Sequence, residues 1–207
     1  IKGTDASIID KSQINNLKLF GNTTGSTTQV KFAGSKSMYF DGSGDYILTP
    51  TSDFFNYGTD DFTMECWVYI PSNPSNYSYL FAQGNSANNT NSIGVYIQSG
   101  VFKIWNGGNI FTGTTSYSLN TWTHLAVSRS GNSLKLYIDG NQEGSSVTNT
   151  SNISTGSSNG IEIARWIGIS DPEHFTGYIQ DFRITKGKAR YTASDETSNI
   201  PSAPLEG

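Results

Sequence analysis

The sequence is short of charge and holds a single cysteine, and both shortages limit what it can do. Only 14% of its 207 residues are charged, and the net charge is −4. Without a basic field to gather phosphate groups, we expect no nucleic-acid partner. The one cysteine, Cys66, cannot form an internal disulfide. It lies on the apolar side of a predicted strand, which favours a buried small side chain over a reactive thiol.

The sequence also lacks long apolar runs and any convincing amphipathic helix. No stretch approaches the roughly 20 consecutive apolar residues that a bilayer-spanning helix needs, so we expect no membrane insertion. The chain starts at Ile1 rather than Met, and we expect it to be part of a longer polypeptide. A weakly charged, disulfide-free composition rich in Asn, Ser, Thr and Gly favours a protein located outside the cell or on a virion surface.

Alternating apolar residues are what the sequence has in abundance. Between residues 62 and 70, every second residue is apolar, and this period of two predicts a strand with one buried face. The buried face would carry Phe62, Met64, Cys66, Val68 and Ile70, and the opposite face Thr63, Glu65, Trp67 and Tyr69.

Residues 121–140 predict a three-strand antiparallel meander. Two runs of strand-forming residues, 122–129 and 134–139, flank a polar turn at 130–133, and Asp139-Gly140 marks a second tight turn. Many short strands of this kind, separated by turn signals, indicate an all-β fold, a two-sheet antiparallel jelly-roll sandwich. We expect a single domain over residues 1–192 and an irregular tail or linker over 193–207.

Several segments together resemble the laminin-G-like, concanavalin A-like jelly-roll superfamily, in its bacterial and phage surface-protein branch. The similarity extends over roughly residues 30–192, and the run at 185–192 looks like domains of virion fibre and surface proteins. The segments that carry it are MYFDGSGDY (38–46), DFTMECWV (61–68), WTHLAV (122–127), LYIDG (136–140) and GYIQDFRI (177–184). The resemblance implies the sandwich fold, but the superfamily mixes lectins, adhesion modules, glycan hydrolases and structural domains.

The residues argue against catalysis. Glycan hydrolases of this superfamily use two carboxylates at alternate positions of a strand. Glu65 is the one strand acid of the right kind, and Trp67 and Tyr69 occupy the positions where a second acid would stand. His124 and His174 lack the spacing of a metal site. We therefore expect that the protein is not an enzyme.

Calcium is a possible cofactor, either structural or bridging a ligand. Hard cations need several oxygen ligands, and Asp41 and Asp45 flank a Gly/Ser loop whose carbonyls could face inward. The resemblance implies calcium near such loops, with Asp181 as the later acid. The alternative is that Asp41 stabilises a turn and Asp181 pairs with Arg183 or Arg165.

Sugar binding needs an aromatic surface with amides and carboxylates nearby. Trp105 and Trp166 lie outside the family-like segments and near polar loops, so they are the better surface candidates. Trp122 is expected in the core, and Trp67 either lines a cleft or packs under a loop. The predicted ligand-binding residues are Trp105, Asn106, Asn109, Trp166, Asp171, Tyr77 and Tyr79, with ordinary burial as the alternative for each.

The sequence thus predicts a non-catalytic carbohydrate-binding or adhesion module of a larger extracellular or virion protein, with a cell-surface or extracellular glycan as partner. The alternative is a structural or protein-interaction domain, such as a decoration or spacer module, that contacts other virion or surface-protein subunits. In that case the exposed aromatic residues would bury against a protein neighbour.

Overall fold

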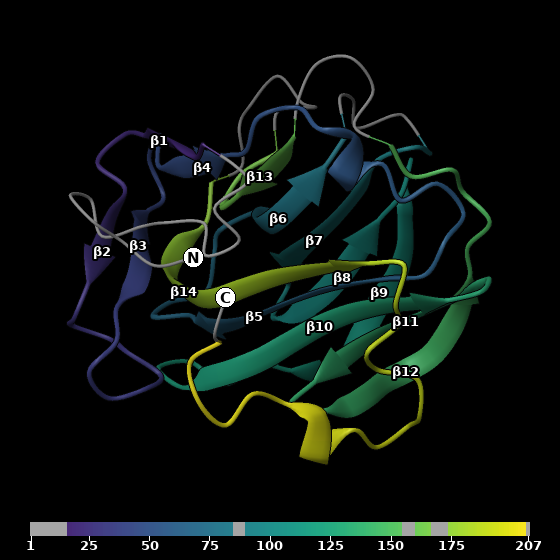
Figure 1. Cartoon of the computed structure of the whole chain (residues 1–207). Coiled ribbons are helices and arrows are strands. Elements are labelled where there is room, and N and C mark those ends of the chain that lie inside the picture. The colour runs from purple at the N-terminus through teal and green to yellow at the C-terminus, as the bar shows by residue number, and fades with distance from the viewer. Residues whose placement is uncertain (1–15, 85–89, 155–159, 167–173, 206–207) are drawn as a thin grey trace.

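Two antiparallel sheets of seven strands each are stacked face to face in the computed structural model, which describes residues 16–84, 90–154, 160–166 and 174–205 (Figure 1). This confirms the predicted all-β sandwich. Sheet A has the order β1 (Lys18–Phe20), β4 (Tyr46–Leu48), β13 (Ile161–Ile163), β6 (Ser78–Gln83), β7 (Ile93–Gln98), β8 (Val101–Trp105), β9 (Asn109–Ser116). Sheet B has the order β12 (Asn141–Thr148), β11 (Ser133–Ile138), β10 (Trp122–Ser130), β5 (Phe62–Tyr69), β14 (Thr176–Lys186), β3 (Ser37–Asp41), β2 (Thr24–Ser26).

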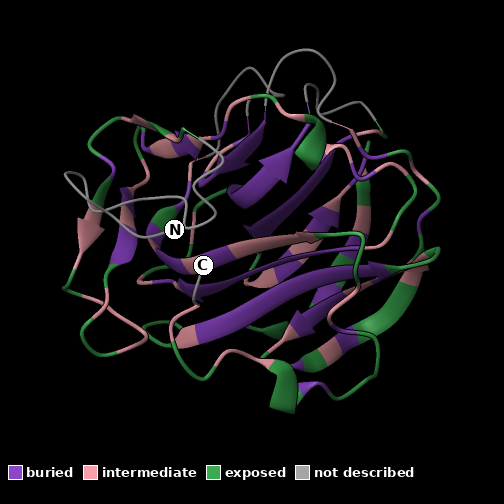
Figure 2. Cartoon of the chain, in the orientation of Figure 1, coloured by how far each residue is buried: buried purple, intermediate pink, exposed green. Residues whose placement is uncertain are grey.

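The core lies between the two sheets and is built by the predicted alternation. Strand β5 sends Phe62, Met64, Cys66 and Val68 inward, and all four belong to the main apolar cluster. Figure 2 shows β5, β10, β6 and β7 as mostly buried strands. Burial and the neighbouring Glu65 carboxylate raise the pKa of the Cys66 thiol, so this thiol is protonated and enclosed, as the sequence indicated.

The predicted meander is present as β10, β11 and β12. Leu125 pairs with Ile138 in one ladder, and Leu136 pairs with Glu143 in the next. The second turn uses Asp139 and Gly140 with φ of 47° and 78°, which is the left-handed backbone that an Asp-Gly pair tolerates.

The chain after β14 folds back over the outer face of sheet B. In Figure 1 this yellow segment descends past β11 and β12, forms the short turn η2 (Thr197–Asn199), and returns toward β14. Residues 193–205, which lie within the predicted tail, are irregular apart from η2, yet they are hydrogen-bonded to the sheet. The backbone N–H of Gln142 donates to the Ser194 carbonyl (2.8 Å), and the Leu205 N–H donates to Asp181 (3.1 Å). We call residues 187–205 the C-terminal strap.

The described residues include no helix long and apolar enough to cross a membrane.

Candidate functional site

Four of the predicted sugar-binding aromatics come together on the outer face of sheet A. Tyr77 and Tyr79 belong to β6 and the loop before it, Trp105 ends β8, and Trp166 follows β13. The Trp166 ring lies 4.9 Å from Tyr79 and 6.2 Å from Trp105, between ring centroids. Tyr96 of β7, which the prediction missed, lies at the centre of the group, 5.0 Å from Tyr79 and 5.6 Å from Tyr77.

We call these five residues, Tyr77, Tyr79, Tyr96, Trp105 and Trp166, the sheet A aromatic cluster. Most of the cluster is buried, so the expectation that Trp166 lies on the surface is wrong. Trp166 is only 1% exposed and Tyr79 only 2%. The reason is Gly94 of β7, because a Cβ at this position would lie 3.1 Å from the Trp166 ring and 3.0 Å from Tyr79. Because Gly94 has no side chain, the rings of Trp166 and Tyr79 can pack directly against the backbone of β7. Trp105 and Tyr77 remain partly exposed at the rim of the cluster.

The polar residues predicted to bind sugar beside these rings differ in their exposure. Asn106 is buried, and its amide is used internally, because its nitrogen donates to the Thr90 and Ser92 carbonyls and its oxygen accepts from Asn149 and Ser151. This corrects the expectation that Asn106 offers a free amide to a ligand.

Asn109 is exposed and donates to the Thr112 hydroxyl (2.8 Å). Asp171 lies outside the described residues. Of the polar groups predicted for the sugar site, Asn109 is therefore the one that the described structure leaves on the surface beside β8 and β9.

Most of the outer face of sheet B is covered by the chain itself. Trp67 of β5 is 3% exposed, with the Lys31 ammonium 3.7 Å above its ring and Phe32 against its edge. Gln180 of β14 holds this covering loop, since it accepts from the Lys31 N–H (2.9 Å) and donates to the Ser35 hydroxyl (2.8 Å). Of the two alternatives for Trp67, packing under a loop is the one observed.

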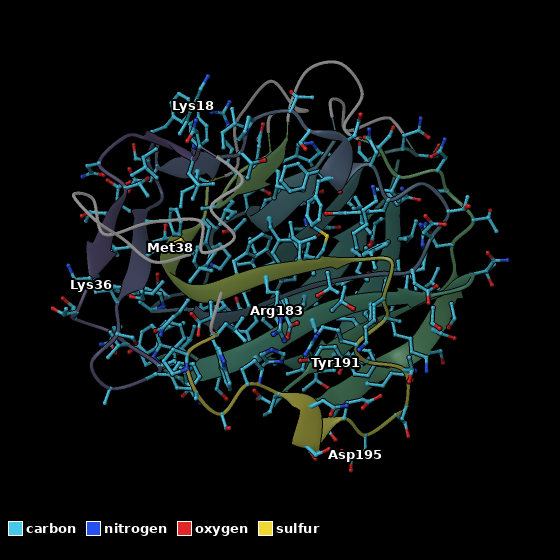
Figure 3. All side chains as sticks on the ribbon, in the orientation of Figure 1. Lys18, Lys36, Met38, Arg183, Tyr191 and Asp195 are labelled. Atoms are coloured by element: carbon cyan, nitrogen blue, oxygen red, sulfur yellow. The ribbon has the colours of Figure 1, made fainter. Side chains whose placement is uncertain are left out.

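The C-terminal strap covers the acid that would be needed for hydrolysis. Glu65 of β5 is 1% exposed; it accepts hydrogen bonds from Arg183 (2.8 Å) and from the Tyr191 hydroxyl (2.6 Å), and its Oε2 lies 3.2 Å from His124 Nε2. Figure 3 shows Arg183 and Tyr191 near one another in front of sheet B. Burial alone would raise the pKa of Glu65, but the bonds from His124, Arg183 and Tyr191 and the Arg183 charge outweigh it and lower the pKa to about 2. Glu65 is thus a fixed anion that anchors the strap.

One row of the outer face of sheet B is left partly exposed, and it consists of four aromatic residues on four adjacent strands. Tyr39 (β3) pairs with Tyr178 (β14), Tyr178 pairs with Tyr69 (β5), and Tyr69 pairs with Trp122 (β10). Successive ring centroids are 5.0, 5.8 and 5.6 Å apart. We call these residues the sheet B aromatic row. Trp122, expected in the core, is partly exposed here instead.

The row also presents hydroxyl groups. Partial burial and the neighbouring phenols of Tyr39 and Tyr69 raise the pKa of Tyr178, so its hydroxyl stays protonated near neutral pH. The Tyr69 hydroxyl donates to the Asn120 amide oxygen at 3.4 Å. The row therefore combines apolar ring surface with hydrogen-bonding groups, which is the combination that a sugar requires.

The three predicted calcium ligands do not meet. Asp41 pairs along the strands with Thr176, and Asp181 lies five residues farther along β14, which is roughly 16 Å at the usual strand rise. Asp181 lies in a β-bulge with φ of 53° and accepts from Leu205, while Arg183 pairs with Glu65 and Arg165 stacks on Tyr46. The structure therefore does not bring Asp181 together with Asp41 and Asp45, and the alternative that Asp181 pairs with an arginine stays a prediction.

Asp41 and Asp45 are close, and Asn22 joins them. Asp45 is buried and accepts from the Asn22 and Asp41 backbone N–H groups, and Asp41 accepts from the Ser43 N–H (2.7 Å). With its nitrogen toward the acids, the Asn22 amide lies 2.7 Å from Asp45 Oδ1 and 3.2 Å from Asp41 Oδ2. Turned over, it would present an oxygen to the same point, which is a ligand that calcium accepts. Calcium binding at Asp41 and Asp45 stays a prediction.

If calcium binds there, it should raise the melting temperature of the parent chain, and an Asp45→Asn variant should lose that rise. At a calcium concentration a hundred times Kd, the gain would be about 2.7 kcal/mol, or about 5–10 °C. The measurement is the calcium-induced change in Tm for each variant, because Asp45→Asn alters the starting Tm itself. Asp181→Asn is the control and should keep the full rise; an unchanged parent Tm would contradict the site.

Comparisons with known proteins place the fold. The family model described as the concanavalin A-like lectin/glucanases superfamily matches residues 41–190, and no curated protein matches the sequence. One similar solved structure is domain 4 of AbnA, an extracellular arabinanase from Geobacillus stearothermophilus, in complex with arabinotriose (TM-score 0.65, 19% identity, 90% of this chain and 88% of that one).

Two further solved structures are similar over most of this chain. One is a putative carbohydrate binding protein from Bacteroides ovatus (TM-score 0.56, 14% identity, 85% of this chain and 63% of that one). The other is the binding domain of Botulinum neurotoxin DC in complex with rat synaptotagmin II (TM-score 0.62, 13% identity, 91% of this chain and 47% of that one). At these identities the likeness concerns the fold alone. Because the family model covers most of the sequence, the chain belongs to the concanavalin A-like lectin/glucanase superfamily.

Proposed function

We propose that the chain is a non-catalytic carbohydrate-binding module of an extracellular protein, and that it binds glycans through the sheet B aromatic row. The observation that carries the proposal is the row itself, with four partly exposed rings in register and hydroxyl groups beside them. A row of aromatic rings, one from each adjacent strand, offers apolar surface on which the apolar faces of sugar rings can stack. Two similar structures support a sugar ligand, since one is an arabinanase domain bound to arabinotriose and the other is a putative carbohydrate binding protein from Bacteroides ovatus.

The same geometry argues against hydrolysis by this domain. A general acid must carry a proton near the working pH, whereas Glu65, with a pKa of about 2, is ionised and enclosed by Arg183, His124 and Tyr191. A two-carboxylate mechanism also needs a second acid facing the first. The neighbours of Glu65 across the sheet are Arg183 and Ala126.

A glycan array tests the proposal. The chain should be displayed as a multimer, because shallow sites bind weakly and gain from several attachments. Trp122→Ala should reduce the affinity for every glycan that the parent chain binds by about tenfold or more. Each factor of ten corresponds to about 1.4 kcal/mol of binding free energy. Circular dichroism should show the fold of the variant unchanged, because Trp122 is partly exposed.

Trp105→Ala is the matched control, since it removes a partly exposed tryptophan from the outer face of the other sheet. We expect it to leave glycan binding unchanged. Loss of binding in Trp105→Ala but not in Trp122→Ala would move the site to the sheet A aromatic cluster. An array with no signal from the multimer would overturn the proposal.

The second candidate function is protein interaction, with other subunits of a virion or surface protein as partners. It is favoured by the partly exposed tyrosines and tryptophan, because aromatic residues are enriched in protein interfaces. The neurotoxin binding domain, solved with synaptotagmin, has the same fold. A silent glycan array, together with a protein complex that Trp122→Ala disrupts, would support this function instead.

A further inference from the structure

We propose that the sheet B aromatic row binds a single, linear, uncharged glycan chain, about four sugar units long, laid across the strands. This inference rests on the proposed function and specifies its ligand. Four observations carry it: the spacing of the rings, their tilt, the charges around them, and the limited length of the row.

The spacing suits a sugar repeat. Each ring of the row comes from the next strand of the sheet, so the rings advance by 5.0, 5.8 and 5.6 Å. The step is set by the distance between hydrogen-bonded strands, about 4.8 Å. A 1,4-linked pyranose chain has a repeat of about the same size, so successive sugar units can meet successive rings. The chain axis would then run perpendicular to the strands.

The tilt of the rings favours a single chain over a flat surface. Tyr39 and Tyr178 are inclined by 42° to one another, Tyr178 and Tyr69 by 84°, and Tyr69 and Trp122 by 57°. Since adjacent strands of a twisted sheet are rotated by roughly 20–25°, the rings cannot form one plane. A crystalline polysaccharide face would touch only some of them, whereas a single chain can rotate about its linkages and follow all four.

The charges around the row favour an uncharged ligand. Asp41 lies two residues from Tyr39 on β3 and faces the same side of the strand. Lys31, a cation on this face, is engaged over the Trp67 ring at 3.7 Å. With a net charge of −4 for the whole chain, the surface would repel an acidic glycan, and the hydroxyls of Tyr39, Tyr69 and Tyr178 suit a neutral one.

The ends of the row set the length of the ligand. Beyond Tyr39 the next strand, β2, offers Thr24 rather than a ring. Beyond Trp122 no residue of the next strand continues the row, because β11 pairs with β10 only from Leu125 onward. The neighbouring rows toward the middle of the sheet are covered by the loop over Trp67 and by the C-terminal strap. The described surface therefore offers four ring positions in one line.

Calorimetric titration with linear xylo-, cello- and arabino-oligosaccharides of one to six units tests the inference. In at least one series, affinity should rise by ~3- to 10-fold for each unit up to about four, and then stay level. Tyr39→Ala, at the far end of the row from Trp122, should remove the gain from the last unit while leaving the shorter oligosaccharides bound as before. Trp105→Ala should leave the whole length dependence unchanged.

The possible failures are distinct. If the array shows binding but affinity does not depend on chain length, or Tyr39→Ala weakens all lengths equally, the linear-chain inference is overturned and the carbohydrate-binding proposal stands. The same holds if only branched or acidic glycans bind. If neither the array nor the oligosaccharides show binding, both proposals fail.

Discussion

Arg129→Met should lower the free energy of unfolding by about 3–5 kcal/mol, the cost typical of removing one partner from a buried charged network. The Arg129 side chain is fully buried, and its guanidinium donates to the carbonyls of Gly58, Asp60 and Ser151 and to the Asn149 amide oxygen. Methionine fills much of the volume but donates nothing. Each acceptor left without a partner costs about 1–3 kcal/mol.

Urea unfolding at neutral pH measures this effect. Arg165→Met is the matched control, because Arg165 is partly exposed and its described contact is stacking over Tyr46, 4.1 Å from the ring centroid. That contact is worth about 1 kcal/mol or less. Equal losses in the two variants would contradict the view that Arg129 holds two separate segments, 58–60 and 149–151, against the sheet.

Glu65→Gln should cost about 3 kcal/mol at neutral pH, and the difference from the parent should vanish in acid. The pKa of Glu65 falls from 4.5 to about 2 on folding, despite burial, because of its bonds to His124, Arg183 and Tyr191 and the charge of Arg183. Each pKa unit corresponds to about 1.4 kcal/mol. Since the folded-state pKa is the lower one, the stabilisation is present above pH 4.5 and is lost as the pH falls from 4.5 to 2.

The measurement is the free energy of unfolding of parent and variant at pH 7, 4.5, 3 and 2. Asp195→Asn serves as control, because this exposed carboxylate bonds only within its own turn, to Thr197. It should follow the parent curve closely. A gap between Glu65→Gln and the parent that stays constant from pH 7 to pH 2 would show that the Glu65 charge does not hold the strap.

The fold could be predicted because alternation and turn chemistry act locally. The apolar residues of β5 and the Asp139-Gly140 turn specify a strand and a hairpin before any tertiary contact is known. The bulge at Asp181 gave no such signal. It shifts the register between Gln180 and Arg183, so it reverses the faces that simple alternation assigns to the residues after it. The separation of Asp181 from Asp41 has another cause, because Asp41 pairs with Thr176, five residues before Asp181.

The candidate site was harder to predict, because exposure depends on what covers a sheet face from elsewhere in the chain. Alternation placed Trp67 and Tyr69 on the same outer face, but only the fold shows that Lys31 covers Trp67 and that Tyr69 remains partly exposed. In the same way, Gly94 decides that Trp166 is buried. Tyr39 lies between the core residues Met38 and Phe40, so its position opposite the apolar face is a signal in the sequence. Tyr178 carries no such signal, because simple alternation puts it on the same face as Phe182 and Ile184, and only the bulge separates them.

The strand order of sheet B also decides when the aromatic row can exist. The row draws one residue from each of four distant points of the sequence, Tyr39, Tyr69, Trp122 and Tyr178, and the last comes from β14, which inserts between β5 and β3. Until β14 has been synthesised and has docked, a nascent chain holds only separate pieces of the surface. The row is a discontinuous epitope, which no short peptide from this sequence can reproduce and which forms only when the sheet is complete.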